Sequence, residues 1–372
     1  MKLIGPFKQL LPMTGLPLKG ALADNQLVIL KDAGILIEGE IIVAIDSFIV
    51  LKQKYANAEI HELKGDHTCL PGFIDSQTQI CFGGSGITKD FWEIVVATRN
   101  TSQEILSKKT AKLANRHLKN GTTTIEIKSG FGLSVAEELK MLRAIKDAAT
   151  QTKVDIITTC FAAQRSPKDA TKNKSTYLQE ISSELFPVLK EEKLTERIAV
   201  TDTSGFNEDQ IASHLEKARA MEFNIVTIEN GLSKCNTTTL ASTHEEVIFT
   251  ALAGTSIGLG TNFTPARKIL DNGDSLAIAS NHNPLTAPMG DLLTQATILG
   301  AFEKLTNAEV LAAITVRAAA ELNLKNSGQL ATGKLADFIL FHTNDYKDIL
   351  YNQGAFKPCV VYKKGEVVFD KH

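Results

Sequence analysis

From Phe73 onward, short β-branched segments alternate with longer stretches that carry helix start and stop signals. This alternation is typical of parallel βα units. It predicts strands over residues 73–79, 122–127, 154–161, 198–202, 224–228, 256–259 and 275–280. About 31 residues separate the strand near Val226 from that near Ile257, which is room for one helix only. We therefore predict a TIM-like βα barrel that is distorted or incomplete, with its sixth strand missing from the pattern.

Both ends of the chain read as antiparallel β structure. Short apolar runs at 27–30, 35–37 and 41–45 are broken by turn residues, which is typical of hairpins. After a helix predicted over 307–322, strands return at 338–341, 359–362 and 367–369. We predict one small β domain, composed of residues 1–70 and 326–372, attached to a barrel over residues 71–325.

Charge and cysteine usage exclude several classes of function. Forty basic and forty-two acidic residues give a formal charge of -2, so the chain lacks the positive field that binds phosphate backbones or anionic membranes. Its five cysteines form no CxxC, which argues against a disulfide framework and a thiolate cluster. The sequence contains no apolar run of about 18 residues, the length that would indicate a membrane span. We expect a cytoplasmic protein without nucleic-acid or membrane partners.

Four segments carry a resemblance to a known family: Pro-Gly-Phe-Ile-Asp at 71–75, Gly-Thr-Thr-Thr-Ile-Glu-Ile-Lys-Ser-Gly-Phe-Gly-Leu at 121–133, Glu-Leu-Lys-Met-Leu-Arg at 138–143 and Gly-Lys-Leu-Ala-Asp-Phe at 333–338. They resemble the imidazolonepropionases of the metal-dependent amidohydrolase superfamily, over nearly the whole chain. The resemblance implies a TIM-like βα barrel with a small β-sandwich domain. It also implies a homodimer, and hydrolysis of a C–N bond in the ring of imidazolone propionate during histidine degradation, by water bound to zinc or iron.

The positions that hold the metal in that family are replaced. Where the resemblance implies His-x-His after the first barrel strand, the chain has Gln77 and Gln79. Ile228 falls on the ligand position at the end of the fifth strand. Asn281 replaces the aspartate that binds metal and moves protons, and an amide cannot act as a general base. Neutral amides hold zinc or iron poorly, so we expect neither metal ligands nor a cofactor.

Substrate-contacting positions have changed as well. Gln164 stands where the resemblance implies a histidine, Gly86 where it implies an arginine, and Phe131 where it implies a tyrosine. Lys128, at the end of the second strand, either contacts a ligand or pairs with another group in the barrel floor. We expect a pocket at seven of the former metal and substrate positions, namely Gln77, Gln79, Lys128, Phe131, Gln164, Ile228 and Asn281.

Two histidines are tentative catalytic candidates. His282, just past the last strand, either lines the pocket as a lone acid or base, or is a loop histidine bonded to backbone. His244 is the local candidate for a further family histidine, but it precedes a helical pattern and could equally be a capping or surface residue.

Two functions follow from these replacements. The first is a metal-free pseudoenzyme with little or no hydrolysis, which binds either a small molecule in the old pocket or a protein partner such as a related subunit. The second is a divergent hydrolase of imidazolone propionate or a related cyclic amide, with an altered metal site. Loss of several ligands together favours the first, because an absent cation removes both transition-state stabilisation and the nucleophile.

Overall fold

The computed structural model describes residues 1–371 except 89, 169–173, 202–203, 230–231 and 238–245. An eight-stranded sheet forms its centre, in the sequential order β7 to β14. The strands are β7 (Phe73–Asp75), β8 (Thr122–Lys128), β9 (Asp155–Ala163), β10 (Arg197–Thr201), β11 (Asn224–Glu229), β12 (Leu232–Thr237), β13 (Glu246–Leu252) and β14 (Ser275–Ala279). All neighbouring strands are parallel except that β12 runs antiparallel to β11 and β13.

The sheet curls until its first and last strands meet. Thr78, beyond β7, forms a parallel bridge with His282, beyond β14. The backbone N–H of Ser280 donates to Asp75 Oδ1 at 2.9 Å, which joins the same two segments. The result is a distorted βα barrel, closed by a single bridge and a side-chain hydrogen bond rather than by a full ladder.

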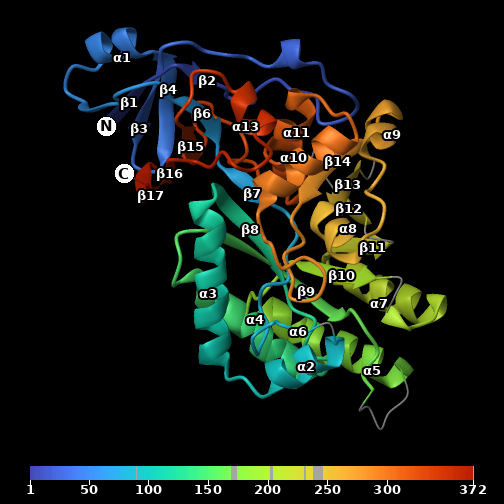
Figure 1. Ribbon diagram of the computed structural model, residues 1–372. Helices are drawn as coiled ribbons and strands as arrows, with labels where there is room; N and C mark the ends of the chain where they lie inside the picture. Colours follow the sequence, from blue (N-terminus) through green and yellow to red (C-terminus); the bar gives the residue numbers. More distant parts are fainter. Residues whose placement is uncertain (89, 169–173, 202–203, 230–231, 238–245, 372) are drawn as a thin grey trace.

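Helices follow most barrel strands and cover the outside of the sheet (Figure 1). They are α2 (Phe91–Arg99), α3 (Gln103–Lys119), α4 (Val135–Ala149), α5 (Lys174–Glu180), the π-helix η2 (Ile181–Leu185), α6 (Phe186–Glu191), α7 (Glu208–Ala220), α8 (Ala253–Leu259), α9 (Ala266–Asp271), α10 (Leu292–Phe302), α11 (Asn307–Ala313) and α12 (Val316–Glu321). Helix α4 begins after Ser134, which caps it because the Ser134 Oγ accepts the Glu137 N–H. No helix among the described residues is long and apolar enough to cross a membrane.

The two chain ends lie together beside the barrel (Figure 1). One sheet has the order β4-β3-β1-β5 and the other β17-β16-β15-β6-β2. Their strands are β1 (Lys2–Phe7), β2 (Gln9–Leu10), β3 (Ala33–Glu38), β4 (Ile41–Ser47), β5 (Glu59–Glu62), β6 (Thr68–Pro71), β15 (Phe338–Phe341), β16 (Val360–Lys363) and β17 (Glu366–Asp370). Two short helices, α1 (Phe48–Lys54) and α13 (Lys347–Tyr351), and the 3-10 turn η1 (Asp24–Gln26) complete the chain.

The two small sheets share one apolar core. Residues of both, including Phe7 and Phe338 with ring centroids 6.2 Å apart, belong to a single buried cluster. Strand β6 pairs with β15, so strands from the two ends of the chain share one sheet. The hairpin predicted over 35–45 is confirmed as β3 and β4.

The predicted strand at 256–259 is wrong. These residues belong to α8, which ends at Gly260 with φ +65, the left-handed conformation of a helix C-cap. The strand lies earlier, at β13, whose apolar run continues into the helix without a break. A short apolar run does not distinguish strand from buried helix, and this ambiguity misplaced the boundary.

Three further expectations need correction. The sixth strand, which the sequence pattern does not show, is present, since β12 and β13 both lie between β11 and β14; the polar sequence of β12 gives no β signal. The helix predicted over 307–322 is broken at Thr315, where φ is -130 and ψ is -95. The run at 27–30 contributes only an isolated bridge from Leu30 to Leu10.

Candidate functional site

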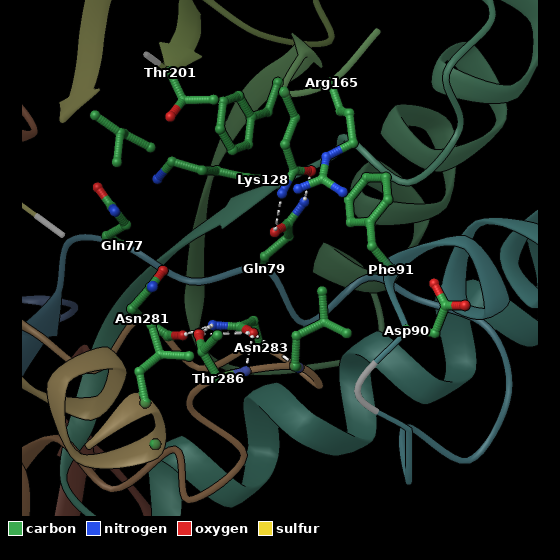
Figure 2. Close-up of a pocket in the computed structure, with 16 residues that line it drawn as sticks. Gln77, Gln79, Asp90, Phe91, Lys128, Arg165, Thr201, Asn281, Asn283 and Thr286 are labelled. Atoms are coloured by element: carbon green, nitrogen blue, oxygen red, sulfur yellow. Dashed lines mark hydrogen bonds between the residues drawn. The ribbon is translucent and has the colours of Figure 1, made fainter. Parts of the chain in front are cut away.

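A cavity of about 860 Å³ opens at the carboxyl ends of the barrel strands, where a βα barrel places its ligand (Figure 2). Residues from most strand ends and from the loops that follow them form its wall. They are Gln77, Gln79, Asp90, Phe91, Lys128, Phe161, Gln164, Arg165, Thr201, Ile228, Gly258, Leu259, Asn281, Asn283, Leu285 and Thr286. Six of the seven residues expected at the former metal and substrate positions therefore lie around one cavity.

The seventh, Phe131, does not line the cavity. It is fully buried and packs against Phe91, with ring centroids 5.7 Å apart. Phe91 lines the cavity, so Phe131 supports the wall from behind. A hydroxyl at position 131 would have to be buried in this apolar contact, which explains why a ring without one fits here.

Gln77 and Gln79 follow β7 and differ in how their amides are used. The Gln79 amide N–H donates to Gln164 Oε1 at 2.6 Å and to the Ser129 carbonyl at 2.7 Å, and Gln164 donates back to Gln79 Oε1 at 3.3 Å. Gln77 is 1% exposed, and neither its amide nitrogen nor its amide oxygen has a hydrogen-bond partner among the described residues. A buried amide without a partner is costly, so this side chain is available to a bound molecule.

Lys128 ends β8 and is the buried cation of the wall. Its Nζ lies 2.7 Å from Glu126 Oε1, and the other oxygen of Glu126 accepts the Thr78 N–H at 3.1 Å. Burial lowers the pKa of Lys128, while the Glu126 carboxylate opposes this shift. Of the two alternatives for Lys128, the buried pair is present in the structure, and ligand contact stays a prediction that its place in the cavity wall supports.

The loop after β14 forms the opposite wall. Asn281 has φ +46, a left-handed conformation that asparagine tolerates, and its amide N–H donates to Thr255 Oγ1 at 2.6 Å. Asn283 Oδ1 accepts the N–H groups of Leu285 and Thr286, and its amide donates to the Asn281 carbonyl. These amides fix the loop, so they are structural as well as exposed to the cavity.

Arg165 and Thr201 are site residues that the sequence did not reveal. The Arg165 guanidinium lies over the Phe91 ring, 4.5 Å from its centroid, and Figure 2 shows it projecting into the cavity beside Gln79. Arg165 directly follows Gln164 in sequence, and Thr201 is the last residue of β10. Their position at or just after the end of a barrel strand is the sequence feature from which both could have been predicted as cavity residues.

His282 faces away from the cavity. It is buried outside the barrel sheet against α3, where its Nδ1 lies 2.8 Å from His117 Nε2 and its Nε2 lies 3.1 Å from Arg116 Nη2. His117 Nδ1 in turn lies 3.5 Å from Asp75 Oδ2. The interpretation of His282 as a pocket acid or base is therefore wrong; its backbone bridges to Thr78 and its ring belongs to this His117–His282 cluster.

Burial is the main cause of unusual titration in the His117–His282 cluster. It lowers the pKa of His117 to about 3 and that of His282 to about 2, with Arg116 adding to both shifts. It raises the pKa of Asp75 to about 7. Both imidazoles are neutral at physiological pH. The other candidate, His244, lies outside the described residues.

The cavity residues do not fit a zinc or iron ion. Among the described residues, no three His, Cys, Asp or Glu side chains lie where they could hold a metal together. The positions that the family resemblance assigned to ligands carry two glutamines, an isoleucine and an asparagine, and the Lys128 ammonium shares their cavity. Zinc and iron sites require imidazole, thiolate or carboxylate donors, and a nearby cation opposes metal binding.

The curled βα sheet, the small two-sheet domain and the cavity at the strand ends define the class of the amidohydrolases. A model of the amidohydrolase family matches residues 227–368. The imidazolonepropionase of Fusobacterium nucleatum is 30% identical over 390 residues, covering 94% of each chain, and that of Alkaliphilus oremlandii is 29% identical over 391 residues, covering 92% of this chain and 93% of its own. The chain belongs to the imidazolonepropionase family.

Solved structures are similar in fold. A. niger ochratoxinase superposes with a TM-score of 0.71 at 16% identity, covering 100% of this chain and 96% of its own. E. coli guanine deaminase superposes with a TM-score of 0.69 at 14% identity, covering 100% of both chains. At these identities the likeness concerns the fold alone.

Proposed function

We propose that this chain is a metal-free member of the imidazolonepropionase family that binds a small molecule in the strand-end cavity and hydrolyses little or none of it. The observation that carries the proposal is the chemistry of the strand ends. Gln77, Gln79, Ile228 and Asn281 line the cavity at the assigned ligand positions, with Lys128 beside them. Without a cation to lower its pKa, water is a poor nucleophile towards an amide at neutral pH.

The cavity itself supports retention of ligand binding. Its volume of about 860 Å³ is in the range of small-molecule sites, and its wall mixes aromatic and aliphatic surface with a few polar groups. The unpartnered Gln77 amide offers one donor and one acceptor. A ligand that satisfied both would remove the cost of leaving them unpaired.

The proposal also includes the cellular compartment and the oligomeric state of the protein. Four cysteines, Cys69, Cys81, Cys160 and Cys359, are buried free thiols, which supports a reducing cytoplasm. A homodimer remains an expectation of the family resemblance.

Turnover of imidazolone propionate tests the proposal. The purified chain is assayed alone and with added zinc, iron or manganese, beside an active imidazolonepropionase. We expect consumption at the uncatalysed rate in every condition. Turnover comparable to that of the active relative would instead support the second function, a divergent hydrolase with an altered metal site.

A variant with restored ligands provides the matched comparison. Gln77→His/Gln79→His/Asn281→Asp supplies two imidazoles and a carboxylate at the positions that the family resemblance assigns to the metal. We expect it to bind zinc at least about tenfold more tightly than the wild-type chain, measured by calorimetric titration. Equal zinc affinity of the two proteins would show that these replacements are not what determines metal binding.

A further inference from the structure

Lys128 is a primary amine that is buried and yet opens onto the cavity. Its side chain is 3% exposed, it belongs to the cavity wall, and Figure 2 shows it extending toward the side where Gln77 and Thr201 lie. Lys363 is equally buried, but its Nζ lies 2.6 Å from both Asp155 and Asp337, and it does not line the cavity. The position of Lys128 therefore combines burial with access to a bound molecule.

The surroundings of Lys128 make its ammonium easier to deprotonate than that of an exposed lysine. Removal from water lowers its pKa, the Glu126 carboxylate opposes this shift, and the positive charge of Arg197 adds to it. Glu126, two residues earlier on β8, has a carboxylate oxygen 2.7 Å from Nζ and can accept its proton. Desolvation, a neighbouring cation and an adjacent base are the means by which lysine amines are activated towards carbonyl carbons.

We propose that Lys128 captures the carbonyl group of a small oxo acid as an imine in the cavity. The inference rests on the proposed function, because it takes the strand ends to be metal-free and available to a ligand. It names the chemical class of that ligand. The carbonyl carbon meets the Lys128 amine, and the carboxylate meets the Arg165 guanidinium, which projects into the same cavity.

The step balances with groups that the chain holds. The Lys128 ammonium gives one proton to Glu126, and the free amine forms a C–N bond to the carbonyl carbon while the C=O electron pair moves to oxygen. Transfer of a second nitrogen proton to that oxygen gives a neutral carbinolamine. Glu126 then returns its proton to the hydroxyl, which leaves as water as the nitrogen lone pair forms the C=N bond. The products are one protonated imine and one water.

Gln77 is placed to assist this step. Its amide N–H can donate to the carbinolamine oxygen and its amide oxygen can accept from the hydroxyl, which would satisfy the two buried atoms that have no partner among the described residues. An oxo acid thus meets the unpaired Gln77 amide as well as the Lys128 amine and the Arg165 guanidinium.

Reductive trapping tests the inference in the full-length chain. The protein is incubated with glyoxylate and sodium cyanoborohydride, which reduces an imine to a stable secondary amine, and is then digested and mapped by mass spectrometry. We expect saturable labelling of one lysine per chain, at Lys128. The internal comparison is Lys109, a half-buried amine outside the cavity whose pKa is lowered to about 8 by burial. Labelling that favours Lys109, or that spreads over exposed lysines, would overturn the inference.

Two variants sharpen the test. Lys128→Arg keeps the positive charge beside Glu126 and should abolish the saturable label. Arg165→Gln removes the cation proposed for the carboxylate, so the preference for glyoxylate over acetaldehyde should fall at least about tenfold. An unchanged preference would contradict the oxo-acid assignment. Labelling and metal content separate the two proposals. A metal-free chain whose Lys128 is not labelled contradicts this inference and leaves the proposed function intact. A chain with stoichiometric metal and a labelled Lys128 contradicts the proposed function.

Discussion

The polar side chains at the strand ends differ in whether they have hydrogen-bond partners. Gln79 and Gln164 are tied together by their amides, and Asn281 is tied to Thr255. Gln77 has no such tie among the described residues. The cavity wall is therefore largely held by its own hydrogen bonds, and the Gln77 amide is the group in it that a ligand can satisfy.

The His117–His282 cluster makes a prediction about pH. His282 has a pKa of about 2 in the folded chain, well below that of an unfolded histidine, so the unfolded state binds a proton that the folded state does not as pH falls below about 6.5. Its contribution to stability is therefore lost as pH falls. The His282→Asn variant lacks this loss. When the pH is lowered from 7 to 5, its free energy of unfolding should therefore rise by about 2 kcal/mol relative to that of the wild type.

Urea unfolding at the two pH values measures this difference. A constant difference between His282→Asn and wild type would contradict the account, because it would show that His282 takes up a proton as readily in the folded chain as in the unfolded one.

Helix α8 packs directly against the loop after β14. A Cβ added to Gly258 would lie 1.6 Å from the Thr286 carbonyl oxygen, so the helix and the loop meet only because this residue has no side chain. Both residues line the cavity. The glycine therefore determines the separation of two cavity walls.

Gly258→Ala should destabilise the chain by about 3 kcal/mol or more, because backbone must move to admit the methyl group. Gly260→Ala is the matched control: it has open space and φ +65, so only the left-handed conformation is penalised, at about 1–2 kcal/mol. Chemical denaturation measures both. Equal losses would show that the contact of α8 with the loop relaxes freely.

The elements also show how far the sequence determines the fold. Strands with β-branched residues, such as β8 and β10, and the β3–β4 hairpin were predictable because their pattern matches their burial. β12 was not, because a strand of Leu-Ser-Lys-Cys-Asn-Thr forms only by pairing with both neighbours. Cavity residues were predictable where they lie at the end of a barrel strand. The orientation of the His282 ring was not predictable, because it depends on packing against α3.

At the scale of the whole molecule, one buried lysine connects the barrel to the small β domain. Lys363, on β16, contacts Asp155 at the start of β9 and Asp337 just before β15. Its side chain is 2% exposed, so removal of the ammonium leaves the buried Asp337 carboxylate without its paired cation.

Lys363→Met should therefore lower the free energy of unfolding by about 3–5 kcal/mol. Its neighbour Lys364 lies 3.5 Å from Asp155 but is 37% exposed, and Lys364→Met should cost less than about 1 kcal/mol. Thermal unfolding compares the two variants. A small effect of Lys363→Met would mean that the attachment of the two parts depends on apolar contacts instead.

The metal content of the whole chain tests the central claim most directly. The protein is purified without chelators, and zinc, iron, manganese and cobalt are measured by inductively coupled plasma mass spectrometry against protein concentration. The arrangement of Gln77, Gln79, Ile228, Asn281 and Lys128 around one cavity predicts far less than one metal ion per chain. One tightly bound zinc or iron ion per chain would contradict the account.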